Sequence, residues 1–310
     1  MTAERARLIV NPSSGRERGV EYVEHLSARI RERYSPLEVV LTAGDGDAER
    51  AGATAVADGC RTLFIAGGDG TVNEAVNGVA SAGGLAETTF GILPFGTGND
   101  FATALGIPLE VDPALDVLLA GRSIPVDLGQ MNGRCFFNTS GGGFVAEVSV
   151  AVTPQLKTIA GRLAYLIGGA QSLLEYEPVR ATVAAEPGGE RIGLGLYAFA
   201  VCNSRLIGGG RLIAPHALID DGLLDLCAIE AMSTLEFVAL ATKVAGGDHV
   251  NDPRVRYLQA STITLTFDRT VKVNTDGEVM EATACEYRVL PRATRFLAGD
   301  ALFTIAAVGN

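Results

Sequence analysis

A glycine-rich segment early in the chain places an aspartate where phosphate chemistry could occur. Residues 64–78 read FIAGGDGTVNEAVNG, with Asp69 among Gly67, Gly68 and Gly70. The apolar residues before it predict a buried strand, and the apolar spacing of three and four after it predicts a helix. A glycine turn beside a helix N-terminus can bind phosphate, although the glycines alone are equally typical of a tight turn. The aspartate favours phosphate binding, because it is useful there when Mg²⁺ lies between it and the phosphates.

Two common phosphate-binding motifs do not fit this segment. A Walker A loop requires a lysine, and the lysines of the chain are Lys157, Lys243 and Lys272, all in its second half. The dinucleotide fingerprint requires a third glycine where this chain has Asn73. The segment therefore predicts a nucleotide-binding turn of another kind.

Composition argues against several other classes of function. A net charge of −11 and a pI near 4.8 disfavour nucleic acid as a partner, and also simple electrostatic docking on anionic lipid. The 5 cysteines are scattered without a C-x-x-C, and the 3 histidines accompany no G-x-S-x-G motif. We therefore expect reduced core cysteines and carboxylates as the groups for acid–base chemistry. No apolar run approaches the roughly 20 residues of a membrane span, and we expect a cytoplasmic protein without a signal peptide.

The elements that would position the glycine turn alternate along the first 120 residues. Strand-like runs at 8–11, 37–42, 63–66 and 90–94 are separated by helical patterns. This alternation predicts a parallel sheet covered by helices, with ligands beyond the carboxyl ends of the strands. Three loops fall at those ends, at residues 11–15, 67–71 and 94–100, and we expect them to converge on one crevice.

After about Pro125 the pattern changes to strand-like segments between Gly, Pro and Asp turns. This change predicts a second, mostly antiparallel β domain. Within it, Ser233 and Glu236 form a capping box that opens a helix ending at about Ala245. Residues 155–175 predict a very apolar helix, which is either core or the mouth of a lipid site.

The three loops together resemble the diacylglycerol-kinase catalytic family, specifically its soluble bacterial lipid kinases. NPSSG, GGDGTVNEAVNG and PFGTGNDFATALGIP match the first three motifs in order. FFNTSGGGF, GGGRLIAPHALIDDGLLDL and VNTDGE continue the likeness, which covers residues 5–297. GGDGT alone is shared with NAD kinases and phosphofructokinases, whereas six ordered motifs are specific. The NDFATALGIP segment is similar to the YegS-like branch.

The resemblance implies two domains with a cleft between them. The first would be a nucleotide-binding α/β domain over residues 1–125, with a parallel sheet like that of NAD kinases and phosphofructokinases. Residues 294–310 would return to it. The second, over residues 126–293, would be a mostly antiparallel, β-sandwich-like domain for the lipid substrate.

The resemblance also implies roles for particular residues. Asp69 and Asp100 would organise catalytic Mg²⁺, and Glu278 would be the proton acceptor. The residues expected to contact ATP are Asn11, Pro12, Ser13, Ser14, Gly15, Thr42, Gly67, Gly68, Asp69, Gly70, Thr71, Val72, Asn73, Glu74 and Thr97.

A separate structural metal site is implied at the carbonyl groups of Leu218 and Leu223 and the carboxylate of Asp221. The residues themselves leave simpler roles open, because 220–222 and 276–277 are both good turn sequences. The chain also departs from many relatives at Thr103, where they have a basic residue that could hold phosphate.

We therefore expect an ATP- and Mg²⁺-dependent lipid kinase that phosphorylates a hydroxyl of diacylglycerol, phosphatidylglycerol or a related lipid. It would be peripheral to the membrane during catalysis, and a homodimer is a further expectation. One alternative is NAD-kinase-like phosphorylation of a soluble metabolite. Another is a regulatory nucleotide-binding module without turnover, against which the presence of Asp69, Asp100 and Glu278 together argues.

Overall fold

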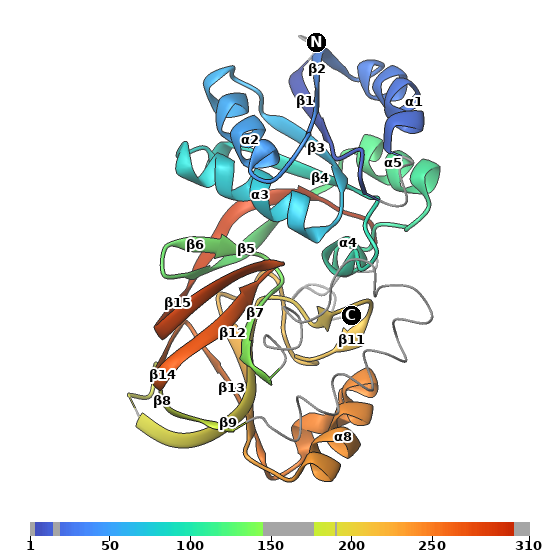
Figure 1. Ribbon diagram of the computed structural model, residues 1–310. Helices are drawn as coiled ribbons and strands as arrows, with labels where there is room; N and C mark the ends of the chain where they lie inside the picture. Colours follow the sequence, from blue (N-terminus) through green and yellow to red (C-terminus); the bar gives the residue numbers. More distant parts are fainter. Residues whose placement is uncertain (1–3, 15–18, 145–176, 190, 301–310) are drawn as a thin grey trace.

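The computed structural model describes residues 4–14, 19–144, 177–189 and 191–300. They form two lobes joined by long strands (Figure 1). Gly15, the helix predicted over 155–175 and the last part of the predicted return, 301–310, lie outside the described residues.

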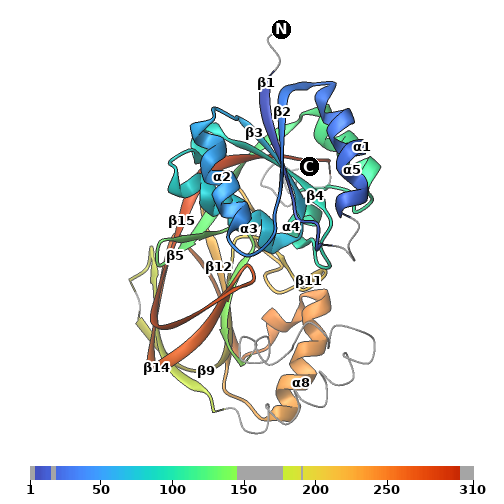
Figure 2. The ribbon, with the colours of Figure 1, turned by 45° about the horizontal axis from the view of Figure 1, so that its top comes forward.

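The first lobe alternates strands and helices as the sequence predicts. Its elements are β1 (Glu4–Val10), α1 (Gly19–Arg31), β2 (Tyr34–Leu41), α2 (Asp47–Ala57), β3 (Thr62–Gly67), α3 (Asp69–Ser81), the 3₁₀ turn η1 (Leu85–Glu87), β4 (Thr89–Pro94), α4 (Asp100–Ala104) and α5 (Val111–Ala120). β1 pairs in parallel with β2 and β3, and β3 pairs in parallel with β4. The four carboxyl ends therefore lie on one edge. Figure 2 shows these strands between α2 and α3 on one side and α1 and α5 on the other.

The second lobe is rich in strands. Its elements are β5 (Ser123–Met131), β6 (Arg134–Phe136), β7 (Thr139–Gly143), β8 (Val179–Glu186), β9 (Arg191–Cys202), β10 (Leu206–Ile207), β11 (Arg211–Leu212), β12 (Leu224–Glu230), α8 (Thr234–Lys243), the 3₁₀ turns η3 (Val244–Gly246) and η4 (Asp248–Asn251), β13 (Val255–Ala260), β14 (Thr262–Thr275) and β15 (Glu278–Leu297). The predicted capping box is confirmed, because Ser233 and Glu236 make both of its hydrogen bonds at the start of α8.

The sheet differs from the prediction in one respect. The parallel strands do not form a sheet of their own, since they belong to a mixed 13-stranded sheet in the order β13-β12-β9-β7-β14-β15-β4-β3-β1-β2, with β5, β6 and β8 attached beside it. Most pairs outside the first lobe are antiparallel. β15 makes the join, because it pairs antiparallel with β14 and β5 and then in parallel with β4 through Arg295 and Phe296. The boundaries drawn at residues 125 and 293 stay predictions.

Each lobe has an apolar core, and the core of the first lobe extends into the second through residues such as Leu128 and Phe137. Phe101 of α4 lies with its ring centroid 4.6 Å from that of Phe137 and 5.1 Å from that of Phe296. These three side chains are fully buried where the lobes meet. Among the helices that the structure describes, none has the length and apolar character needed to cross a membrane.

Candidate active site

Two glycine loops of the first lobe touch at the carboxyl edge of the sheet. A Cβ atom added to Gly96 would lie 2.5 Å from the Cα atom of Gly68, so only glycine allows this backbone contact. The loop after β1 joins them, because Asn11 Nδ2 donates to Thr71 Oγ1 at 3.0 Å. The structure thus brings together the three loops that the sequence placed at this edge.

Asp69 and Asp100 begin neighbouring helices, α3 and α4. The carboxylate of Asp69 accepts weak hydrogen bonds from the backbone N–H groups of Asp100, at 3.3 Å, and Phe101, at 3.4 Å. A Cβ atom added to Gly98 would lie 3.3 Å from one oxygen of Asp69 and 3.4 Å from one oxygen of Asp100. Burial and the nearby charge of Asp100 raise the pKa of Asp69. The two carboxylates therefore share one small region.

Asp100 also connects the two lobes. Its carboxylate accepts backbone N–H groups of Gly209, at 3.0 Å, and Gly210, at 2.8 Å, in the turn between β10 and β11. Both glycines have positive φ, +86° and +91°, which directs successive N–H groups toward the carboxylate. This contact was not predicted from the sequence, although the run of three glycines at 208–210 was a signal for it.

The predicted nucleotide-contacting residues after β1 and after β2 lie near the carboxyl ends of these strands. Asn11, Pro12, Ser13 and Ser14 follow β1, where the backbone N–H of Ser13 donates to Asn11 Oδ1 at 3.0 Å. Thr42 follows β2 and is mostly buried. These residues flank the carboxyl edge at which a nucleotide would lie.

The residues of the glycine turn differ in what they can offer a nucleotide. Gly70 is exposed and Thr71 is 9% exposed, with Gly67 and Gly68 just before them. The side chain of Val72 is in the apolar core, so a contact with a nucleotide would have to use its backbone. Asn73 is fully buried, and its Nδ2 has no hydrogen-bond partner among the described residues.

The two remaining predicted contacts lie on either side of this turn. The carboxylate of Glu74 accepts the backbone N–H of Gly46 at 3.1 Å, which attaches the loop after β2 to α3. Thr97 is exposed in the loop after β4.

Glu278, at the start of β15, is held by an arginine. Arg134 Nε donates to Glu278 Oε2 at 2.9 Å and Arg134 Nη2 donates to Glu278 Oε1 at 2.6 Å. The same guanidinium donates to both oxygens of Glu49 on α2, at 2.9 and 2.7 Å. Glu49 and Glu278 raise the pKa of Arg134 above its usual range, and Arg134 lowers the pKa of Glu49. Neither Arg134 nor Glu49 was singled out from the sequence.

Asp276 precedes Glu278 in the turn between β14 and β15 and has a positive φ of 46°. Its carboxylate accepts three backbone N–H groups, from Phe137 at 2.8 Å, Asn138 at 3.1 Å and Thr139 at 2.8 Å. Burial raises the pKa of Asp276 to about 7, the charge of Asp69 acts in the same direction, and the three N–H donors oppose it. Asp276 therefore fixes the turn that carries Glu278 and adds a third acidic group near Asp69.

The predicted structural metal site lies in the turn before β12. Asp221 Oδ1 accepts the backbone N–H of Leu223 at 3.0 Å, and Leu218 lies in the preceding loop. Burial raises the pKa of Asp221 to about 6, and the charges of Asp225 and Asp127 add to the increase. Within the described parts of the chain, no three His, Cys, Asp or Glu side chains gather closely enough to hold a metal ion. The ligand role of these residues stays a prediction.

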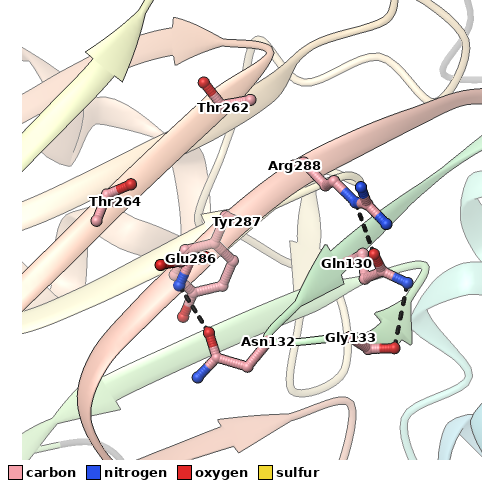
Figure 3. Close-up of a pocket in the computed structure, with 8 residues that line it drawn as sticks. All are labelled: Gln130, Asn132, Gly133, Thr262, Thr264, Glu286, Tyr287 and Arg288. Atoms are coloured by element: carbon pink, nitrogen blue, oxygen red, sulfur yellow. Dashed lines mark hydrogen bonds between the residues drawn. The ribbon is translucent and has the colours of Figure 1, made fainter.

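A polar groove lies apart from these residues, on strands β5, β14 and β15 and the turn after β5 (Figure 3). Its side chains and backbone bond to one another: Arg288 Nε donates to Gln130 Oε1 at 2.6 Å, and the N–H of Glu286 donates to Asn132 Oδ1 at 2.8 Å. The groove includes none of the predicted catalytic or nucleotide-binding residues.

Comparison with known proteins defines the class of the chain. Residues 5–131 match the diacylglycerol kinase catalytic domain, and residues 140–298 match the YegS C-terminal NAD kinase beta sandwich-like domain. The chain belongs to the diacylglycerol kinase catalytic domain family. This confirms the resemblance predicted from the six motifs, together with the two-domain architecture and its strand-rich second part.

Particular relatives extend over nearly the whole chain. The chain is 34% identical to the diacylglycerol kinase of Bacillus subtilis over 276 residues, which cover 89% of this chain and 90% of that protein. It is 36% identical over 284 residues to a protein of Pseudomonas aeruginosa named "Probable lipid kinase YegS-like", with 91% of each covered. The solved structure of a diacylglycerol kinase from Bacillus anthracis has the same fold, with a TM-score of 0.75 at 22% identity, covering 97% of this chain and 99% of that one.

Proposed function

We propose that the protein is a lipid kinase that transfers a phosphoryl group from ATP to a lipid hydroxyl. The observation that carries the proposal is the meeting of Asp69 and Asp100 at the N-termini of α3 and α4, beside the glycine loops in contact. Phosphoryl transfer depends mainly on positioning and electrostatic stabilisation, which such a site can supply. The names of the relatives from Bacillus subtilis and Pseudomonas aeruginosa support the same activity.

ATP would lie along the carboxyl edge of the parallel strands. The N-terminus of α3 directs backbone N–H groups and a partial positive charge toward this edge, which suits phosphate. Gly68, Gly70 and Thr71 are the groups of the turn best placed to meet phosphate, because Val72 and Asn73 face the interior. The loop after β1, with Asn11, and the loop after β2, with Thr42, would border the rest of the nucleotide.

The donor set of Asp69 and Asp100 fits Mg²⁺. Two hard carboxylate groups lie near each other, and burial with mutual repulsion raises the pKa of Asp69. Mg²⁺ is commonly bound by one or two carboxylates together with substrate phosphates, so a site without a third protein ligand is an ordinary one. When bound, the ion would neutralise charge on the transferring phosphoryl group.

We propose Glu278 as the proton acceptor for the lipid hydroxyl. It lies at the start of β15, and the preceding turn is fixed to the chain near Phe137 by Asp276. Its two hydrogen bonds with Arg134 hold the carboxylate in one place and one plane. Asp69 and Asp100 would instead serve as ligands of the metal ion, which leaves Glu278 as the carboxylate for the hydroxyl proton.

The acceptor would be diacylglycerol, phosphatidylglycerol or a related lipid, met by a cytoplasmic protein at the membrane surface. The test is radiolabelled ATP with Mg²⁺ and a panel of pure lipids in mixed micelles, followed by chromatography of the products. NAD and water-soluble alcohols serve as the other acceptors. Label in one lipid supports the proposal. Label only in a soluble acceptor, or only in free phosphate, would refute it.

A further inference from the structure

We infer that Arg134 is a positioning residue that fixes the proton acceptor Glu278 to the nucleotide-binding lobe. The inference rests on the proposed role of Glu278 and adds a residue that neither the motifs nor the family comparison assigns. Arg134 lies in β6, whereas Glu278 begins β15 and Glu49 lies on α2. One guanidinium thus joins three elements from distant parts of the sequence.

The geometry of the pair restricts the carboxylate of Glu278 strongly. Nε and Nη2 of Arg134 each donate to a different oxygen of Glu278, at 2.9 and 2.6 Å. Two parallel charge-assisted hydrogen bonds fix both the place and the plane of a carboxylate, which a single contact cannot do. A lysine would supply the charge without this fork.

The guanidinium is itself anchored on the other side. Its Nη1 and Nη2 donate to the two oxygens of Glu49, at 2.9 and 2.7 Å. Glu49 cannot easily move away, because α2 packs against α3 so closely that a Cβ atom on Gly78 would lie 1.9 Å from the carbonyl oxygen of Glu49. Arg134 is therefore held between two carboxylates, one of which belongs to a tightly packed helix pair.

The backbone of β6 is fixed to the same helix pair. Asn77 of α3 donates from Nδ2 to the carbonyl oxygen of Cys135 at 2.9 Å and accepts the N–H of Cys135 through Oδ1 at 2.9 Å. Asn77 is 5% exposed, so water competes little for these hydrogen bonds. Since Cys135 follows Arg134 directly, both the backbone and the side chain of this arginine are held by α2 and α3.

The contacts from Glu278 through Arg134 to Glu49 lead to α2, which begins beside the proposed nucleotide site. α2 begins at Asp47, immediately after the loop that contains Thr42, and Gly46 of this loop donates to Glu74 of α3. Arg134 therefore holds the proposed proton acceptor, Glu278, in a fixed position relative to the lobe that would bind ATP. Its loss should slow the transfer step and leave ATP binding largely intact.

The experiment compares Arg134→Gln, Arg134→Lys and Glu278→Gln in steady-state assays with ATP and the labelled lipid substrate. We expect Arg134→Gln to lower kcat by roughly 10- to 100-fold, the scale of a misplaced catalytic group, with little change in the KM for ATP. Arg134→Lys should recover part of this loss. The double variant Arg134→Gln/Glu278→Gln should be no slower than Glu278→Gln, because both changes remove the same function.

Arg254→Gln is the matched control. Arg254 also bridges two carboxylates, with Nη1 2.7 Å from Glu236 and Nε 2.9 Å from Asp252, and it lies beside α8 in the second lobe. Its side chain is 34% exposed, compared with 26% for Arg134. Kinetics unchanged in this variant would show that loss of a bridging arginine as such does not slow the reaction.

The outcomes separate the inference from the proposed function. If Glu278→Gln retains kcat, the proposed proton acceptor is wrong. If Glu278→Gln loses kcat while Arg134→Gln stays within about twofold of the wild type, this inference is wrong and the proposed function stands. Should Arg134→Gln fail to fold, Glu49→Ala decides, since it removes the anchor and leaves the Arg134–Glu278 pair. A lowered kcat supports the inference, and an unchanged kcat overturns it.

Discussion

Replacement of Asp69 by Asn should stabilise the metal-free protein while it stops phosphoryl transfer. The wild-type site holds the carboxylates of Asp69 and Asp100 close together, and the charge of Asp69 also contributes to the raised pKa of Asp276. Without a cation these charges repel one another. The substituted amide would keep the shape of the side chain and one hydrogen-bond acceptor, and would remove one charge.

The expected gain in stability follows from the distances at Gly98. A Cβ atom added to Gly98 would lie 3.3 Å from an oxygen of Asp69 and 3.4 Å from an oxygen of Asp100. These two oxygens are therefore no farther apart than roughly 7 Å. At an effective dielectric constant of about 20, two unit charges at that distance repel by about 2 kcal/mol. Partial exposure of Asp69 and the loss of one of its two contacts with the N-terminus of α4 reduce the net gain to about 1 kcal/mol. The melting temperature should rise by about 2 °C.

The pH dependence gives a second measure of the same effect. The pKa of Asp69 is raised, so the folded state binds this proton more tightly than the unfolded state does. Wild-type stability therefore falls as the pH rises from the ordinary pKa toward the raised one. The advantage of Asp69→Asn should be greatest at neutral pH and shrink as the pH falls toward about 4, because Asp69 takes up its proton over this range and the repulsion is lost.

The assays are thermal unfolding in EDTA between pH 4 and 8, and lipid phosphorylation with Mg²⁺. Activity should fall by about 10²-fold or more, as for the loss of a preorganised electrostatic group. Asp268→Asn, an exposed position in β14, controls for the change in net charge. A lower melting temperature at pH 7, or a gain that persists at pH 4, would refute the electrostatic reasoning. Retained activity would refute the metal role.

Three further changes test other parts of the site. Glu278→Gln should lower kcat by about 10²–10⁴-fold in the lipid assay and change ATP affinity little, because general-base assistance is lost; lost ATP binding would instead place Glu278 in the nucleotide or metal site. Gly78→Ala should destabilise the protein by about 1–3 kcal/mol in urea unfolding, since its Cβ would lie 1.9 Å from the carbonyl oxygen of Glu49; an unchanged midpoint would contradict this packing. Asp221→Ala should reduce the rise in melting temperature with added Mg²⁺, because one of two proposed metal sites is weakened; an identical response in wild type and variant would leave Asp221 as a turn residue.

Local signals carried most of what the sequence could predict. The run at 63–66 placed β3 within one residue at each end of Thr62–Gly67, and the glycines with the apolar spacing after them predicted a turn and a helix where α3 (Asp69–Ser81) lies. Ser233 and Glu236 likewise fixed the start of α8, because a capping box is complete within four residues. The alternation of strand and helix patterns along the first lobe predicted its parallel pairs, because a helix between two strands is the usual connection of a parallel pair.

Contacts between distant residues were beyond these signals. Arg134 is 85 residues from Glu49 and 144 from Glu278, and an arginine in a short strand has no pattern that points to either. Asp276 reads as a turn residue, and its three N–H donors lie near residue 138. The mixed sheet was missed because periodicity describes the faces of a strand and says nothing about which strand adds to its edge.

The shared strand β15 makes the two lobes one folding unit. The two family matches divide the chain between residues 131 and 140, which suggests a natural place to cut it. A fragment ending at Met131 would nevertheless lack β15, so β4 would present unpaired backbone groups at a new edge. Phe90 and Phe101 would also lose the ring of Phe296, exposing apolar surface beside that edge. An exposed strand edge beside apolar surface favours pairing between copies, so we expect this fragment to aggregate when it is expressed without the rest of the chain.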